Sequence, residues 1–127
     1  MTYKPFGKEL IFDCSGCDIF AITNKDVIKD FIKELCIIGD MKPKGETLFV
    51  DFEDNEFNRK NDIVGYTVVQ VISLSNITLH FNNISRTAYM NFFTCGSIDE
   101  YKIYNLFVDY FKPIKINERL ITRCAMA

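Results

Sequence analysis

Three residues with reactive side chains lie in the middle of the chain: Ser75, His80 and Cys95. His80 is the only histidine among 127 residues. The stretch 65–96 contains two β-like runs that meet at Ser75 and a third that ends at Cys95. We therefore expect a hydroxyl, an imidazole and a thiol to come close together at strand ends, where they could support nucleophilic chemistry.

The common hydrolase and nucleotide-binding motifs are missing. A Ser-His-Asp triad is possible in composition, but no Gly-x-Ser-x-Gly motif surrounds Ser75. No Walker loop and no Gly-x-Gly-x-x-Gly motif is present. Cys95 and His80 could instead act as a thiol nucleophile and its base. Each residue could also have a structural role only: His80 as a strand residue, Ser75 as a turn residue and Cys95 as a small buried hydrophobe.

Length and composition predict one domain over residues 1–127 with a real hydrophobic core, since 48% of the residues are hydrophobic. The net charge of −2, with both signs interspersed, argues against a nucleic-acid partner. The sequence contains no run of about 18 apolar residues, so we expect no membrane-spanning helix. The first nine residues lack the apolar core of a signal peptide, so we expect a cytoplasmic location.

The cysteines are expected to be free thiols. Their number is odd and no secretion signal is present. Cys14 and Cys17 form a lone CxxC motif, and a zinc site would need two more ligands. With one histidine in the chain, we expect no metal.

The hydrophobic pattern predicts an α+β fold, a two-layer sandwich in which an antiparallel sheet carries two helices on one face. Asn24 is a good N-cap for the first helix, which ends at Gly39, and Ser97 would open the second through a capping box with Glu100, with Pro113 stopping it. A sheet covered on one side leaves a face or an edge on which dimers can form. The predicted strands cover residues 8–13, 46–52, 66–72, 77–81, 87–94 and 114–121, and the segment 51–62 is predicted to be an exposed connection.

Two segments resemble the signature of the small prokaryotic-type S-adenosylmethionine decarboxylases. These segments are Ile72-Ser-Leu-Ser-Asn-Ile-Thr-Leu-His80 and Phe93-Thr-Cys-Gly96. The family's signature runs Ser-Glu-Ser-His-Leu-Thr-Ile-His-Thr-Trp-Pro-Glu and later Phe-Thr-Cys-Gly. The gap between the second serine and the cysteine matches without insertion. A weaker match extends from Gly7-Lys-Glu-Leu to the end, so the resemblance covers nearly the whole chain.

The resemblance implies a proenzyme that cuts itself between Leu74 and Ser75. The new chain would begin at a pyruvoyl group derived from Ser75, whose carbonyl takes the substrate's α-amine and accepts the electrons left by carbon dioxide. His80 matches the histidine that moves protons during self-cleavage, and Cys95 matches the proton donor in turnover. Thr67 matches a serine that helps processing. The family also implies a homodimer, S-adenosylmethionine as substrate and a product that donates aminopropyl groups for spermidine synthesis.

Two residues and one segment depart from the family's pattern and leave alternatives open. Leu74 replaces a glutamate, and Asn76 replaces a histidine. The segment 81–84 reads Phe-Asn-Asn-Ile where the family has Thr-Trp-Pro-Glu, residues associated with holding the nucleoside. Asn82 cannot stack as an indole does, and Ile84 supplies no carboxylate. The alternatives are a pyruvoyl enzyme acting on arginine or ornithine, or a non-catalytic regulatory paralogue.

Overall fold

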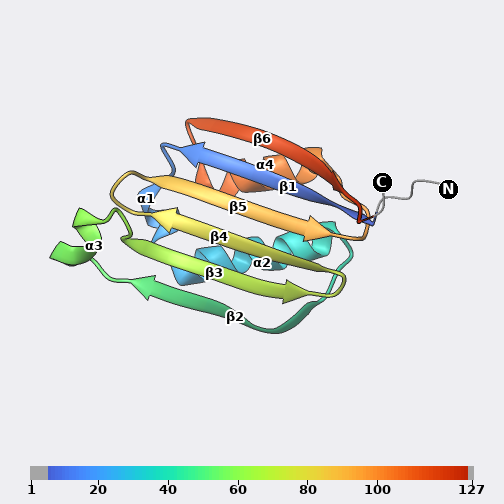
Figure 1. Cartoon of the computed structure of the whole chain (residues 1–127), viewed down its shortest axis with the longest axis horizontal. Coiled ribbons are helices and arrows are strands. Elements are labelled where there is room, and N and C mark those ends of the chain that lie inside the picture. The colour runs from blue at the N-terminus through green and yellow to red at the C-terminus, as the bar shows by residue number, and fades with distance from the viewer. Residues whose placement is uncertain (1–5, 126–127) are drawn as a thin grey trace.

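The computed structural model describes residues 6–125, and within this range six strands form one antiparallel sheet (Figure 1). Residues 1–5, part of the segment that we examined for a signal peptide, lie outside it. The strand order is β2-β3-β4-β5-β1-β6. The strands are β1 (Gly7–Ser15), β2 (Pro43–Phe52), β3 (Gly65–Ile72), β4 (Ser75–Asn82), β5 (Thr87–Thr94) and β6 (Lys115–Arg123).

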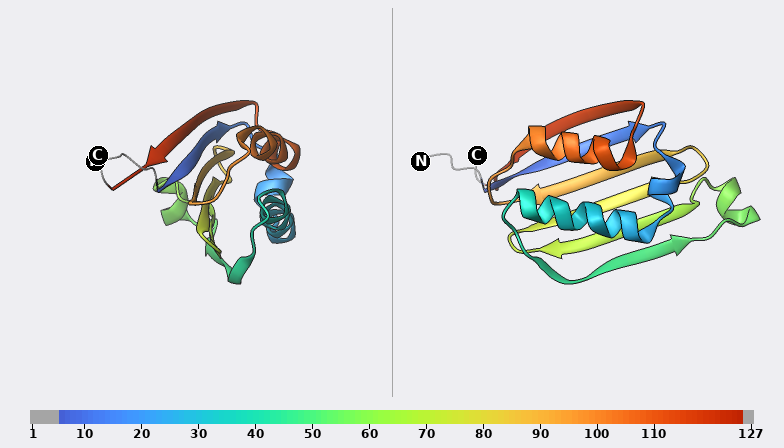
Figure 2. Two further views of the ribbon diagram at one scale, coloured as in Figure 1. Left: turned by 90° about the vertical axis from the view of Figure 1, so that its right-hand side faces the viewer. Right: turned by 180° about the vertical axis from the view of Figure 1, so that it is seen from behind.

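Two long helices, α2 (Lys25–Ile38) and α4 (Glu100–Phe111), lie side by side on one face of this sheet (Figure 2). The predicted two-layer α+β fold, with an antiparallel sheet and two helices on one face, is confirmed. Two short helices, α1 (Ile19–Ile22) and α3 (Glu56–Lys60), were not predicted, since one or two helical turns give no clear periodicity. None of the helices in the described range is both long and apolar enough to cross a membrane.

Helix α2 begins and ends where the sequence predicts. The Asn24 side chain accepts hydrogen bonds from the backbone N–H groups of Asp26 and Val27, at 3.0 and 3.3 Å. Gly39 closes the helix, although Asp40, not the glycine, takes the left-handed conformation, with φ of 50°. The buried stripe contains Ile28, Phe31, Ile32, Leu35 and Cys36.

The N-cap of helix α4 lies two residues later than predicted. The expected capping box between Ser97 and Glu100 is wrong, because the side chain of Asp99 caps the helix instead. Its carboxylate accepts from the backbone N–H of Lys102 at 3.1 Å. A carboxylate also complements the positive end of the helix dipole, which a serine hydroxyl does not. The helix ends before Pro113, as predicted.

The core lies between the sheet and the two long helices. Phe31 of α2 contacts Phe107 and Phe111 of α4, with ring centroids 5.7 and 5.0 Å apart. Phe12 of β1 packs on Phe107 at 5.3 Å, and Phe81 of β4 packs on Phe111 at 5.2 Å. These edge-on and tilted arrangements are the favourable ones for aromatic rings. These ring contacts join the two helices to each other and join α4 to β1 and β4 of the sheet.

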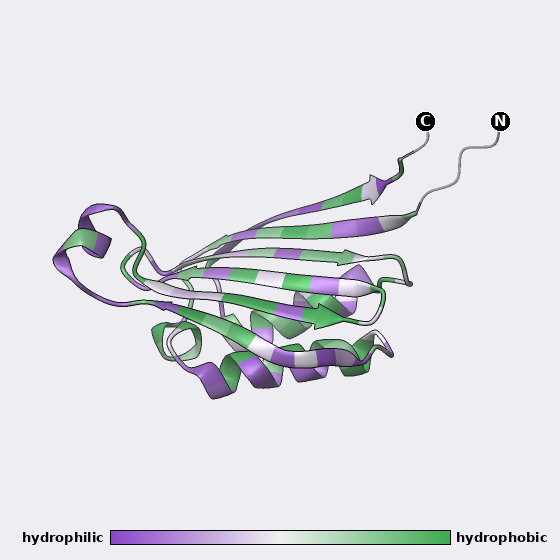
Figure 3. Ribbon diagram, turned by 60° about the horizontal axis from the view of Figure 1, so that its bottom comes forward, coloured by the Kyte–Doolittle hydropathy of each residue, from purple (hydrophilic) through white to green (hydrophobic). Residues whose placement is uncertain are grey.

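Within residues 6–125, the other face of the sheet carries no helix. Hydrophobic and hydrophilic residues alternate along the strands, as Figure 3 shows. On β2, the predicted apolar positions Leu48, Val50 and Phe52 do share one side, but they lie on the uncovered face and are 58%, 41% and 37% exposed. Phe49 faces the helical layer and packs against Tyr66. The uncovered face is therefore partly apolar.

Candidate active site

Ser75 is the first residue of β4, directly after the turn made by Ser73 and Leu74. The strand begins two residues earlier than predicted, so Ser75 pairs within the sheet. Its side chain faces the helical layer and is 9% exposed. The hydroxyl has two acceptors, Thr94 Oγ1 at 2.6 Å and Met41 Sδ at 3.1 Å. The oxygen is the stronger acceptor, so the proton points towards Thr94.

The backbone carbonyl of Leu74 accepts two hydrogen bonds from one residue. The backbone N–H and the Sγ of Cys95 both donate to it, each at 3.0 Å. Two donors withdraw electron density from the carbonyl carbon and would stabilise negative charge on its oxygen. The bond between Leu74 and Ser75 therefore joins a polarised carbonyl to a residue that carries its own hydroxyl nucleophile.

The turn that carries this bond is also held from the side of β2. The backbone N–H of Ser73 donates to the carbonyl of Lys42 at 2.9 Å. The Ser73 hydroxyl donates to the same carbonyl at 3.2 Å and lies 3.3 Å from the Lys42 N–H. With Cys95 on one side and Lys42 on the other, the turn is fixed from both neighbouring segments.

His80 lies on the face of β4 opposite to Ser75. Residues an odd number of positions apart point to opposite faces of a strand, and five residues span roughly 17 Å. His80 Nδ1 is instead 3.1 Å from the hydroxyl of Thr67, its partner on β3. The expectation that the imidazole joins the hydroxyl and the thiol is therefore wrong within one chain. The structure brings together Ser75 with Cys95, and Thr67 with His80.

A hollow of about 340 Å³ opens beside the Thr67–His80 pair. This volume is in the range of small-molecule sites. Its lining combines an imidazole, a carboxylate and aromatic rings, from Phe52, Asp62, Ile63, Gly65, Thr67, His80, Phe81, Asn82 and Tyr89. A larger hollow of about 660 Å³, between α4 and β6, contains none of the reactive residues predicted from the sequence.

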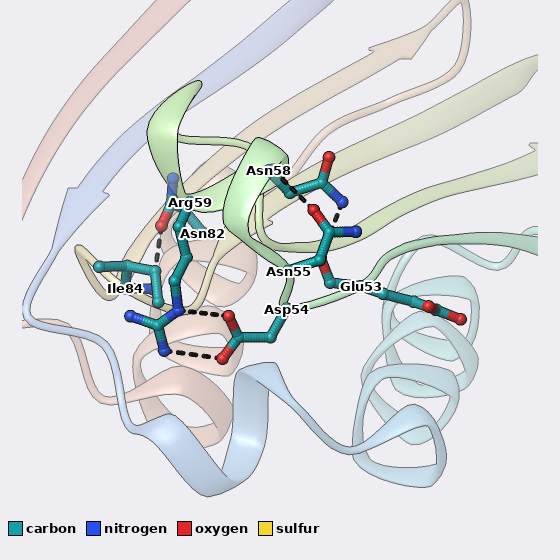
Figure 4. Close-up of polar contacts among 7 residues, drawn as sticks. All are labelled: Glu53, Asp54, Asn55, Asn58, Arg59, Asn82 and Ile84. Carbon is teal, nitrogen blue, oxygen red and sulfur yellow. Dashed lines mark hydrogen bonds and ion pairs between the residues drawn. The ribbon is translucent and has the colours of Figure 1, made fainter.

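The segment 81–84, which departs from the family's signature, leads into a turn that hydrogen bonds of the Asn82 side chain hold in place. Asn82 Nδ2 donates to the backbone carbonyl and to the Oδ1 of Asp62, both at 2.8 Å. Asn82 Oδ1 accepts from the N–H of Ile84 at 3.0 Å (Figure 4) and from the N–H of Ser85 at 3.1 Å. Both ends of this amide are therefore engaged, while the Ile84 side chain is 47% exposed. The amide of Asn82 holds the wall of the hollow in place.

The predicted exposed connection next to this turn is folded around α3. The Asn55 side chain caps the helix by accepting from the N–H of Asn58 at 2.8 Å (Figure 4). Arg59 forms a two-pronged ion pair with Asp54, and the hydrogen bonds lower the pKa of Asp54 and raise that of Arg59. The pair is exposed, so its effect on stability is small. It still orders the segment that leads to Asp62.

Three other thiols lie in the core. Burial, with smaller effects from Cys17 and Asp13, raises the pKa of Cys14 to about 12, and burial raises the pKa of Cys17 to about 11. Burial also raises the pKa of Cys36. These thiols are neutral at neutral pH and poor nucleophiles. Among residues 6–125, no three His, Cys, Asp or Glu side chains are grouped to hold a metal ion.

Two residues of the site were not found from the sequence. Thr94 stands directly before Cys95 in the Phe-Thr-Cys-Gly segment, and the strand register places it opposite Ser75. A correct prediction of the register between β4 and β5 would have identified Thr94. Met41 comes from the connection after α2, where no pattern in the sequence indicates a contact with β4.

The fold places the chain in a known structural class. The structure is similar to the crystal structure of the adenosylmethionine decarboxylase from Aquifex aeolicus VF5, with a TM-score of 0.78 and 17% sequence identity. The match covers 98% of this chain and 95% of that chain, and at this identity it shows a shared fold. A search of curated proteins finds no match.

The sequence family is shown by a separate comparison. The family model for S-adenosylmethionine decarboxylase matches residues 8–124. The chain therefore belongs to the S-adenosylmethionine decarboxylase family, a family of carboxy-lyases, and the resemblance noted in its sequence is confirmed.

Proposed function

We propose that this protein is a pyruvoyl-dependent S-adenosylmethionine decarboxylase that forms its cofactor by cutting itself between Leu74 and Ser75. In this proposal it supplies the aminopropyl donor for spermidine synthesis, in the cytoplasm. The observation that carries the proposal is the pair of hydrogen bonds from Cys95 to the Leu74 carbonyl, next to the Ser75 hydroxyl. An ordinary turn residue needs no such polarisation.

The first step of self-cleavage uses groups that are already in place. Ser75 Oγ forms a bond to the Leu74 carbonyl carbon, and the bond from that carbon to the Ser75 nitrogen breaks. The hydroxyl proton ends on this nitrogen, so a peptide bond becomes an ester and a free amine. Negative charge develops on the Leu74 oxygen, where both Cys95 donors are aimed. Loss of the Cα proton of Ser75 then releases the Leu74 carboxylate, and water replaces the nitrogen as ammonia leaves.

The residues around this bond fit a pyruvoyl group at position 75. A pyruvoyl carbonyl supplies an electron sink that no amino-acid side chain provides. Cys95 Sγ, 3.0 Å from the neighbouring carbonyl oxygen, would remain beside the new N-terminus. From there it can hold a proton for the carbon that loses carbon dioxide. Thr94 and Met41 bound the same position on the helical side.

His80 and Thr67 enter this proposal through a second copy of the chain. Their pair lies on the uncovered face, whose exposed apolar side chains favour a homodimer. A two-fold axis between two stacked sheets, running across the strands, would bring the His80 end of one β4 over the Ser75 end of the other. From that face an imidazole approaches the Ser75 backbone, where the Cα proton must be removed.

The folded turn at 82–85 favours a second candidate substrate class. Because the Asn82 amide is engaged at both ends and Ile84 offers no polar group, this turn cannot hold a nucleoside as the family's Trp-Pro-Glu segment does. A pyruvoyl enzyme acting on arginine or ornithine would not need that contact. Release of labelled carbon dioxide from S-adenosylmethionine, arginine and ornithine in parallel would decide between them.

The intact mass of the purified chain tests the proposal. We expect two polypeptides, residues 1–74 and 75–127, the second with a blocked N-terminus that reacts with hydroxylamine. The Ser75→Ala variant, which lacks the nucleophile, should remain full length. A wild-type chain that stays uncut and carries no reactive carbonyl would contradict self-cleavage and leave the regulatory paralogue as the remaining alternative.

A further inference from the structure

Thr94 and Cys95 are consecutive residues at the end of β5, and they hold the two reacting groups of the Leu74–Ser75 bond. Cys95 donates to the Leu74 carbonyl, and Thr94 Oγ1 lies 2.6 Å from Ser75 Oγ. The pairing of β4 with β5 sets both contacts, because Ser75 lies directly opposite Thr94. One dipeptide therefore fixes the electrophile and the nucleophile relative to each other.

The Thr94 hydroxyl is fully buried and its orientation is fixed. Its side chain has no exposed surface, and its oxygen accepts from the backbone N–H of Gly96 at 2.9 Å. Its proton can point to Met41 Sδ, 3.9 Å away. With that N–H on one lone pair, the remaining lone pair is available for the Ser75 hydroxyl. A valine would fill the same space with no acceptor.

The direction of the Ser75 proton decides how this serine can react. When the proton points into Thr94, the lone pairs of Ser75 Oγ are free to face the Leu74 carbonyl carbon. A threonine hydroxyl and a thioether are both too weakly basic to remove the proton at neutral pH. Thr94 therefore cannot act as the base, and its contribution is to orient the nucleophile.

We propose that Thr94 is a positioning residue for self-cleavage, and that it acts through Ser75 by holding the hydroxyl proton away from the scissile carbonyl. This inference rests on the proposed function, since it concerns the rate of the same cleavage. It assigns a role in the reaction to a residue that packing alone would explain only as part of the core.

The test compares Thr94→Val with Thr94→Ser. Each chain is made in a cell-free translation pulse, and the conversion of full-length chain into two fragments is followed on denaturing gels. We expect cleavage to slow about tenfold or more in Thr94→Val, as for a misplaced reacting group, and to stay within about threefold of wild type in Thr94→Ser. Thermal unfolding of both variants in a Ser75→Ala background measures folding without cleavage.

The possible results separate this inference from the proposed function. Cleavage of Thr94→Val at the wild-type rate, or equal slowing in Thr94→Ser, would overturn the positioning role, because the hydroxyl would then not matter. If the wild-type chain is never cut, the proposed function fails. In that case, the positioning role fails with it, because there is no cleavage for Thr94 to assist. A wild-type chain that is cut, with Thr94→Val cut equally fast, would overturn the positioning role alone and leave the proposed function standing.

Discussion

Cys14 and Cys17 show how much the surroundings of a thiol decide its chemistry. Both residues are buried, 4% and 1% exposed, at the end of β1. Burial raises the pKa of each thiol far above the ordinary value of 9.0. Cys95, by contrast, is half-buried, with its sulfur directed at a backbone carbonyl. The two core thiols therefore serve packing, whereas the thiol just after β5 is directed at the Leu74 carbonyl.

The raised pKa values predict a loss of stability at alkaline pH. Above pH 9 the unfolded chain loses its thiol protons while the folded chain keeps them, so each thiol lowers the free energy of unfolding by up to about 1.4 kcal/mol per pH unit. Urea unfolding of wild type and of the Cys14→Ala/Cys17→Ala variant at several pH values above 9 measures how steeply the free energy of unfolding falls with pH in each. Parallel slopes would show that the two thiols do not titrate differently in the folded state.

At this scale the sequence predicts part of the grouping of Ser75, His80 and Cys95. Ser75 and Cys95 lie close together, as expected, and the contact of Cys95 with the Leu74 carbonyl was not predicted. His80 is not in this group, because β4 already includes Ser75, and residues five positions apart in a strand point to opposite faces. The predicted start at residue 77 left Ser75 outside the strand and free to turn towards either face. The backbone pairing of Ser75 with β3 and β5 therefore determines which face its side chain points to.

Among the elements, the turn between β3 and β4 contains a residue with an uncommon backbone conformation. Leu74 has a φ of 63°, in the left-handed region that bulky residues rarely adopt. Its side chain is 71% exposed, so little packing holds it there. Two sets of hydrogen bonds over-determine the shape of this turn: Cys95 donates to the Leu74 carbonyl, and Ser73 donates to the Lys42 carbonyl. Strain of this kind is often found at reacting positions.

Replacing Leu74 by glycine should relieve this strain. In a Ser75→Ala background, which prevents cleavage, we expect Leu74→Gly to raise the free energy of unfolding by about 1 kcal/mol, because glycine adopts positive φ without a steric cost. Leu74→Ala is the matched control: it removes the same exposed side chain but keeps the strain. Chemical denaturation measures both. An equal gain in the two variants would place the effect in the side chain and not in the backbone.

The helices show where local patterns suffice and where they fail. The length of α2 and its Asn24 cap follow from a 14-residue apolar periodicity. The start of α4 was misplaced because Ser97 and Asp99 are both good caps, and only the path of the chain after Gly96 selects between them. Helices α1 and α3, of four and five residues, depend on tertiary contacts that the sequence does not display.

For the whole molecule, the main feature is the uncovered sheet face, where apolar side chains remain exposed to solvent. Besides Leu48, Val50 and Phe52, it exposes Val71 by 56% and Tyr89 by 46%. The order of one-sided helices and strands predicted a sheet with one open face. It did not predict that the apolar side of β2 would be on that face, because alternation alone does not say which side meets the helices.

We expect charge on this face to weaken the proposed homodimer. Leu48→Lys and Val71→Lys place a cation among apolar side chains and should each weaken self-association about tenfold or more. Phe20→Lys, at a 79% exposed position on α1, is the control and should leave it unchanged. Sedimentation velocity over a range of concentrations measures the association. A monomeric wild type, or variants that associate as tightly as wild type, would contradict this interface.

The order of the strands has a consequence for a chain cut after residue 74. One piece would own β1, β2 and β3, and the other β4, β5 and β6, yet the two sets are interleaved in the sheet. Of the five strand pairings in the described sheet, three would join different pieces: β3 with β4, β5 with β1, and β1 with β6. Helices α2 and α4, which pack together, would also belong to different pieces. The severed polypeptides would thus remain interlocked, and neither could leave without dismantling the sheet that both complete.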